Sequence, residues 1–160
     1  PSCMNDLAEL HGLFFEDLKV GMTAIYARTL TETDIVLFAG ISGDNNPVHI
    51  NEEFASNTAF SGRIAHGMLT ASFISTVLGM KLPGPGAIYV SQTLRFKAPV
   101  RSGDTLNVRA TVTDLVPDKR RATLSTVITV GNKTVLEGKA VVIVPLRSMV
   151  PGAEAAAKKS

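Results

Sequence analysis

The sequence is poor in charge and almost free of cysteine. Only 19% of its 160 residues are charged, and 16 basic residues nearly cancel 14 acidic ones to leave a net charge of +2. Like charges are scattered rather than gathered into a basic arm, which argues against a nucleic-acid partner. Cys3 is the only cysteine, which excludes a disulfide framework and a thiolate metal cluster and favours a reducing compartment.

Signals for export or membrane insertion are also lacking. Residues 1–10 include Asp6 and Glu9 and show no basic start followed by an apolar run. The apolar stretch 68–80 is interrupted by serine and threonine and is too short to span a bilayer. We therefore expect no membrane insertion and a cytoplasmic location.

The sequence is rich in apolar residues, which make up 45% of it. This composition and the chain length predict one compact domain rather than a disordered chain. We place the domain at residues 15–147, after an N-terminal extension (1–14). Pro151 and Gly152 precede an alanine-rich end, so residues 148–160 are expected to form a flexible tail.

The second half of the chain alternates apolar and polar residues, a pattern typical of half-buried strands. It predicts an antiparallel meander of strands near 89–97, 106–112, 122–130 and 133–144. Turns are expected at Asp118-Lys119 and at Gly131-Asn132, and Gly138 suggests a bulge in the last strand.

The first half predicts a strand over 22–31, a helix that begins at 31–33, and a second helix over about 66–80. Residues 67–80 carry no charge at all, so this second helix has no solvated face and is expected to be buried. The predicted architecture is α+β, with an antiparallel sheet wrapped around one central helix.

A polar loop at residues 40–50 holds the first candidate site. Asp44 and His49 lie five positions apart around Asn46-Pro47, and a carboxylate beside an imidazole is a common general acid/base pair. The alternative is an Asx turn that caps a helix beginning near Asn51, a frequent role of Asp and Asn.

The start of the buried helix is the second candidate. The N–H of Gly67 is open to an acyl oxygen because glycine has no side chain and the first helical N–H groups have no internal partner. Alternatively, His66 caps the helix and Gly67 permits close packing. Ser75 lies on the same helix face, and its hydroxyl bonds either the carbonyl one turn back or Asp44.

Several other site types have no support. The turn around Pro83-Gly84 is not a phosphate-binding loop, and no Gly-x-Ser-x-Gly nucleophile elbow is present. His49 and His66 are too far apart in sequence to share a helix face as metal ligands.

Three motifs in order resemble the MaoC-like family of (R)-specific enoyl-CoA hydratases, which have a hot-dog fold. The resemblance covers about residues 15–145. The motifs are Ser42-Gly43-Asp44-Asn45-Asn46-Pro47-Val48-His49, Ala65-His66-Gly67-Met68, and Leu94-Arg95-Phe96-Lys97-Ala98-Pro99-Val100 followed by Gly103-Asp104.

The resemblance implies roles for individual residues. Asp44 and His49 would be the catalytic dyad, with Asn46 shaping the site. Gly67 N–H would bind the thioester oxygen, and Phe96 would line the acyl-CoA path. A sixth residue, Ser75, would position the catalytic aspartate, and Leu78 is a candidate for the end of the acyl tunnel.

The resemblance also implies hydration of a trans-2-enoyl-CoA to the (3R)-hydroxyacyl-CoA without a metal or other cofactor, in a homodimer. Two alternatives remain open: an acyl-CoA thioesterase on the same fold, and an acyl-binding subunit that has lost catalysis. The motifs do not determine acyl-chain length, or whether the acyl carrier is coenzyme A or a carrier protein.

Overall fold

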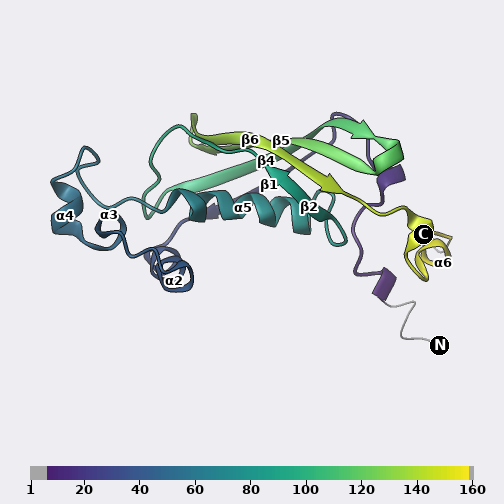
Figure 1. Cartoon of the computed structure of the whole chain (residues 1–160), viewed down its shortest axis with the longest axis horizontal. Coiled ribbons are helices and arrows are strands. Elements are labelled where there is room, and N and C mark those ends of the chain that lie inside the picture. Colours follow the sequence, from purple (N-terminus) through teal and green to yellow (C-terminus); the bar gives the residue numbers. More distant parts are fainter. Residues whose placement is uncertain (1–6, 159–160) are drawn as a thin grey trace.

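The computed structural model describes residues 7–158. A six-stranded antiparallel sheet has the order β1-β4-β5-β6-β2, and β3 also pairs with β6 (Figure 1). The strands are β1 (Thr23–Thr29), β2 (Ile88–Gln92), β3 (Arg95–Phe96), β4 (Thr105–Val116), β5 (Arg121–Val130) and β6 (Lys133–Ile143). The α-helices are α2 (Glu32–Ser42), α3 (Pro47–Ile50), α4 (Glu52–Ser56), α5 (Gly67–Met80) and α6 (Ala153–Ala157), with short 3-10 turns at η1 (Phe15–Asp17), η2 (Pro117–Lys119) and η3 (Arg147–Met149).

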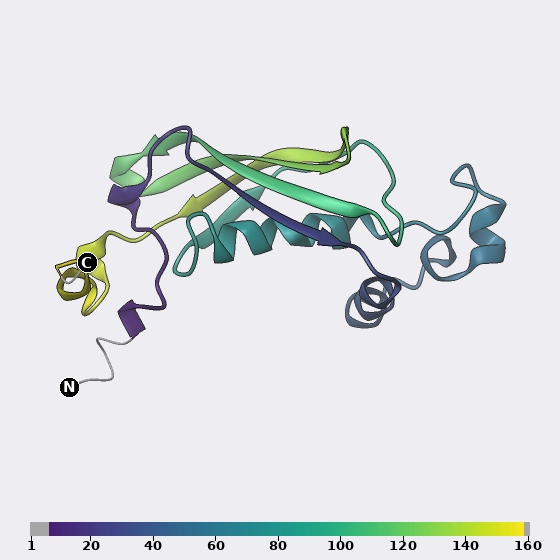
Figure 2. The same ribbon diagram turned by 180° about the vertical axis from the view of Figure 1, so that it is seen from behind.

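Helix α5 lies along one face of the sheet, which curves over it (Figures 1 and 2). Ile74 and Val77 of α5 are 1% and 0% exposed, and they belong to the same core as Leu106 and Ile128 of the sheet. Burial of these side chains is the main source of stability, at about 25 cal/mol per Å² removed from water. The predicted sheet wrapped around a central helix is confirmed.

The side of α5 that faces away from the sheet is exposed within one chain. Met68 and Met80 are 57% and 70% exposed, and Ser72 and Ser75 are exposed as well. One curved sheet covers only one side of a helix, so an uncharged helix surface remains open on the other side.

Helices α2, α3 and α4 gather beyond the N-terminal end of α5, and the two described ends of the chain lie at the opposite end of the molecule (Figure 1). The predicted helix start at 31–33 is confirmed, and Thr31 caps α2: its hydroxyl accepts from Asp34 N–H, and the Asp34 carboxylate accepts from Thr31 N–H. Burial alone would raise the pKa of Asp34, but these bonds and Arg28 lower it below its usual value.

The predicted strand over 89–97 is divided into β2 and β3, and the predicted bulge at Gly138 is wrong. Gly138 pairs in register with Thr126, and the irregularity between β5 and β6 falls at Ile128/Thr129 instead. Gly138 lies opposite the break between β2 and β3, where a Cβ atom would collide with the carbonyl oxygen of Thr93. The glycine therefore permits a close backbone approach.

Residues 148–158 differ from the flexible tail expected for 148–160, and residues 159–160 lie outside the described residues. Residues 153–157 form α6, and Ala153 is buried in a small cluster with Ala8, Phe14 and Val150. An alanine-rich segment can bury its methyl groups once an apolar partner such as Phe14 is available, and sequence alone did not reveal that partner. No helix within residues 7–158 is long and apolar enough to cross a membrane.

Replacing Gly138 tests the close approach. We expect Gly138→Ala to lower the free energy of unfolding by about 2 kcal/mol, because the new methyl group forces β2 and β6 apart. Gly40→Ala is the control: position 40 lies in α2 with open space around its Cβ, so alanine should stabilise by up to about 1 kcal/mol. Urea denaturation followed by circular dichroism measures both; equal effects would contradict the packing account.

Candidate active site

The loop between α2 and α3 is built from side-chain caps. Gly43 ends α2 in the left-handed region with φ 75°, which glycine adopts without strain. Asp44 Oδ1 then accepts from Asn46 N–H at 3.2 Å, and Asn46 Oδ1 accepts from Val48 N–H at 3.1 Å to cap α3. Asp44 and Asn46 therefore form Asx turns as the alternative expected, but these turns lead into α3 at Pro47. The helix near Asn51 is capped by Asn51 itself, whose Oδ1 accepts from Phe54 N–H at 2.9 Å. The turn occupies only one oxygen of Asp44.

The second oxygen of Asp44 faces His49. The distance between Asp44 Oδ2 and His49 Nε2 is 4.0 Å, which is too long for a direct hydrogen bond and can be bridged by one water molecule. His49 Nδ1 lies 2.8 Å from the carbonyl oxygen of Ile64. A carbonyl only accepts, so Nδ1 carries the proton and Nε2 presents a lone pair to the same space as the carboxylate.

His66 has a role that the sequence did not indicate. It precedes α5 but makes no side-chain cap bond; instead its Nε2–H donates to the backbone carbonyl of Asp44 at 2.9 Å. Its ring stacks on His49 at 3.9 Å between centroids and meets the edge of Phe38 at 4.9 Å. His66 therefore holds the start of α5 against the Asp44 loop. The only sequence signal was its position beside Gly67.

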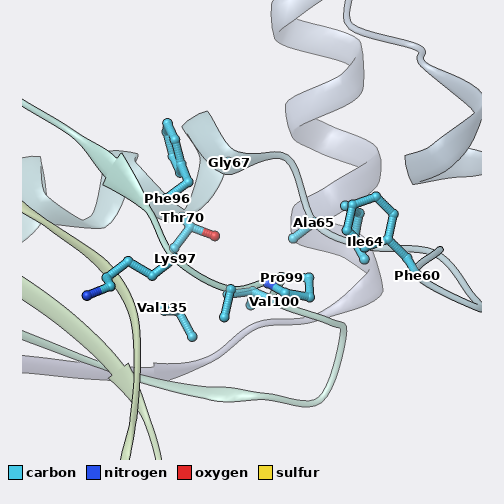
Figure 3. Close-up of a pocket in the computed structure, with 11 residues that line it drawn as sticks. Phe60, Ile64, Ala65, Gly67, Thr70, Phe96, Lys97, Pro99, Val100 and Val135 are labelled. Carbon is cyan, nitrogen blue, oxygen red and sulfur yellow. The ribbon is translucent and has the colours of Figure 1, made fainter.

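Gly67 begins α5, and its N–H has no acceptor among the described residues. The ring of Phe96 lies over it, so a Cβ at position 67 would be 2.9 Å from a ring carbon. Both residues line a cavity of about 310 Å³ that is also bordered by Ile64 and Lys97 (Figure 3). An acyl oxygen entering this cavity can reach an unpaired N–H at the positive end of a helix.

Three potential metal ligands lie together, since Asp44, His49 and His66 each offer an atom within 4.8 Å of the others. The two imidazoles, however, are stacked with an interplanar angle of 29°. Lone pairs lie in the ring plane, so stacked rings do not direct them at one ion, and each ring already donates to a carbonyl. This geometry suits proton transfer better than metal binding.

The comparisons with known proteins agree on a family. A family model described as "MaoC like domain" matches residues 17–137. The chain belongs to this MaoC-like family. It is 59% identical over 134 residues to an (R)-specific enoyl-CoA hydratase of Rhodospirillum rubrum, covering 84% of this chain and 93% of the relative. It is 53% identical over 139 residues to a 3-hydroxybutyryl-CoA dehydratase of Methylorubrum extorquens, covering 87% and 88%.

Solved structures of (R)-hydratases have the same fold as this chain. An R-hydratase from Pseudomonas aeruginosa matches with a TM-score of 0.81 at 41% identity, covering 86% of this chain and 88% of that one. The (R)-hydratase from A. caviae matches with a TM-score of 0.78 at 43% identity, covering 81% and 99%. The resemblance read from the three motifs, and the hot-dog fold that it implied, are confirmed.

One predicted site residue of this MaoC-like chain, Ser75, lies away from Asp44. Ser75 is exposed and lines a separate groove with Phe38, Met68 and Tyr89, and its hydroxyl forms no hydrogen bond with Asp44 or with the carbonyl one turn back. Eight residues of helix separate it from Gly67 by about 12 Å. Within one chain, the prediction that Ser75 positions Asp44 is therefore not met. Leu78 is 2% exposed and lies in the core.

The contact between Gly67 and Phe96 predicts non-additive mutations. We expect Gly67→Ala to lower the free energy of unfolding by about 1 kcal/mol, because its methyl group displaces the Phe96 ring. In a Phe96→Ala background the same change should be neutral or stabilising, since alanine favours the helix and the obstacle is gone. A double-mutant cycle in urea measures the coupling; additive effects would show that the ring moves away freely.

Proposed function

We propose that this chain is an (R)-specific enoyl-CoA hydratase, which adds water to a trans-2-enoyl-CoA to form the (3R)-hydroxyacyl-CoA and catalyses the reverse dehydration. One observation carries the proposal: Asp44 Oδ2 and His49 Nε2 face each other at 4.0 Å beside the start of α5. The names of the relatives above support the same reaction and substrate class.

The substrate thioester would bind with its carbonyl oxygen on Gly67 N–H. This group lies at the first turn of a 14-residue helix, whose N-terminal end favours negative charge. As water adds to C3, charge builds on the thioester oxygen in an enolate-like state. One such preorganised donor is typically worth about 3 kcal/mol of transition-state stabilisation.

Asp44 and His49 would handle the water. Asp44 Oδ2 accepts one of its hydrogen bonds and orients it, while His49 Nε2 accepts the proton as the oxygen attacks C3. The resulting imidazolium then delivers that proton to C2, which collapses the enolate and restores neutral His49. Because the water and the proton come from one side, the addition is syn.

The reaction as written needs no metal and no resident cofactor, and coenzyme A enters only as part of the substrate. The cavity beside Gly67 and Phe96 would receive the thioester end of the acyl-CoA. A cytoplasmic location is part of the proposal, and the single cysteine suits a reducing compartment.

We further propose a homodimer built on the open side of α5. The groove there runs between α5 and β2, and Met68 and Ile88 are 57% and 60% exposed beside it. Strand β2 is last in the sheet order and has unpaired backbone groups on its outer side. A second copy meeting edge to edge would pair these groups and cover the uncharged side of α5.

The activity is tested with crotonyl-CoA and no added cofactor, by following the loss of enoyl absorbance. We expect Asp44→Asn and His49→Ala to lower kcat about 100-fold or more, since each removes one partner of the water. His11→Ala is the control, because His11 stacks on Phe14 away from the Asp44 loop.

A dehydrogenase specific for the 3R alcohol should oxidise the product. Release of free thiol would instead identify a thioesterase, and binding without turnover would identify an inactive acyl-binding subunit. Full activity of either dyad variant would contradict the mechanism.

The dimer is tested by light scattering during size-exclusion chromatography. We expect a mass of twice 17.0 kDa for the wild type and a shift toward the monomer for Val90→Asp, because Val90 lies on β2 and is 42% exposed. Val20→Asp is the control, since Val20 is 62% exposed and precedes β1. A wild-type monomer would contradict this part of the proposal.

A further inference from the structure

A short segment, residues 62–67, carries most of the candidate site. The backbone carbonyl of Ile64 accepts from His49 Nδ1 at 2.8 Å. His66 Nε2 donates to the backbone carbonyl of Asp44 at 2.9 Å and so holds the Asp44 loop. Gly67 then offers its unpaired N–H. The position of this segment therefore determines three features of the site together: the proton position on His49, the place of Asp44, and the donor for the thioester.

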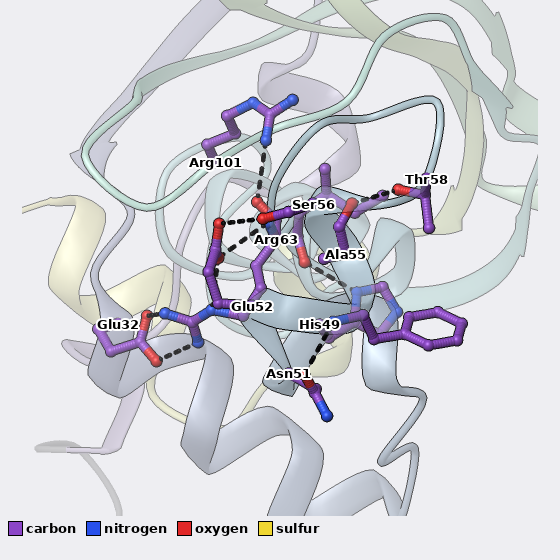
Figure 4. Close-up of polar contacts among 11 residues, drawn as sticks. Glu32, His49, Asn51, Glu52, Ala55, Ser56, Thr58, Arg63 and Arg101 are labelled. Carbon is purple, nitrogen blue, oxygen red and sulfur yellow. Dashed lines mark hydrogen bonds and ion pairs between the residues drawn. The ribbon is translucent and has the colours of Figure 1, made fainter.

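Arg63 joins this segment to Glu32, Glu52 and Arg101 through hydrogen bonds (Figure 4). Its guanidinium donates to both carboxylate oxygens of Glu32, at 2.7 and 3.1 Å. Its Nε and its backbone N–H both donate to Glu52 Oε2, at 3.2 and 3.3 Å. The backbone carbonyl of Arg63 accepts from Arg101 Nη1 at 3.2 Å. The Arg101 guanidinium also donates to the backbone carbonyl of Phe60.

These contacts join separate elements of the structure. Glu32 is the first residue of α2 and Glu52 is the first residue of α4, whereas Arg101 follows the segment that lines the cavity. The hydrogen bond from Arg63 N–H, with help from its side chain, holds the pKa of Glu52 below its usual value. The pairs are partly exposed, at 29% for Arg63 and 49% for Glu32, so each adds little to overall stability.

The geometry around Arg63 indicates a role other than a contribution to the free energy of unfolding. We infer that Arg63 is a positioning residue that holds the Ile64 carbonyl against His49 Nδ1 and thereby keeps Nε2 unprotonated toward Asp44. The kinetic consequence rests on the proposed function, whereas the effect on the His49 proton does not. The role requires arginine, because only a planar fork can bind two carboxylates from different directions while the backbone bonds stay in place.

The test replaces Arg63 in the full chain by methionine, which keeps an unbranched stem but donates no hydrogen bond. Ring nitrogen spectra of 15N-histidine-labelled protein report which nitrogen of His49 carries the proton, with the signal assigned by its loss in His49→Ala. We expect a fraction of Nε2–H form to appear in Arg63→Met. With crotonyl-CoA, kcat should fall about tenfold or more, because small displacements of catalytic groups are costly. KM should change much less than kcat, since Arg63 does not line the cavity.

Arg147→Met is the matched control. Arg147 binds both carboxylate oxygens of Asp17 at 2.8 Å and its side chain is 28% exposed, close to the 29% of Arg63. It lies in η3 after β6, and the chain after β6 runs to the end of the molecule opposite α2 and α4 (Figure 1). Loss of this pair should lower stability to a similar degree while the His49 signal and kcat stay unchanged. Arg63→Lys should lie between wild type and Arg63→Met.

The outcomes separate the inference from its alternatives. An unchanged His49 proton position and unchanged kcat in Arg63→Met overturn the inference, and so does a loss of stability alone that equals the loss in Arg147→Met. If Arg63→Met does not fold, Glu32→Gln replaces it, because it removes the charge of the partner without changing its shape. A wild-type protein without hydratase activity would refute the proposed function, yet the spectra would still decide the role of Arg63.

Discussion

The hydrogen bond from His49 Nδ1 to the carbonyl of Ile64 is the interaction on which the rest of the site depends. A neutral imidazole carries one proton, and this acceptor holds it on the nitrogen that points away from Asp44. Nε2 is thereby left as a base facing a carboxylate at 4.0 Å. Any displacement of residues 62–67 would release that constraint and would move Gly67 as well.

Capping and the proposed chemistry use the same residues in this loop. Asp44 closes an Asx turn with one oxygen and faces His49 with the other, while Asn46 caps α3 and so orients the helix that carries His49. The structural and functional interpretations of the loop are therefore not alternatives. A side chain whose rotamer is held by a backbone bond presents its remaining atoms with little entropic cost, which is what a preorganised site requires.

The fold and the proximity of Asp44 to His49 were predictable because they depend on local patterns. Alternation identified β4, β5 and β6, and the uncharged run identified α5. Gly138 was misinterpreted because a glycine in a strand signals either a bulge or a close approach, and only the position of Thr93 decides between them. Within one chain Ser75 lies apart from Asp44, because helix periodicity states which face a residue shares and does not state how far along the helix its partner lies. His66 was missed because its acceptor is a backbone carbonyl, which leaves no trace in the side-chain sequence.

By itself the sequence determined the main strands, the uncharged central helix that packs on the sheet, the family and the chemical types of the candidate site residues. Periodicity and short motifs express these directly, since they depend on neighbours within one or two turns. The tertiary structure decided where protons and charges lie: the pairing of His49 with Ile64 over 15 positions, and the joining of Arg63 to Glu32 over 31. Such contacts depend on distances between elements that pack only after the core has formed. No local pattern in the chain encodes them.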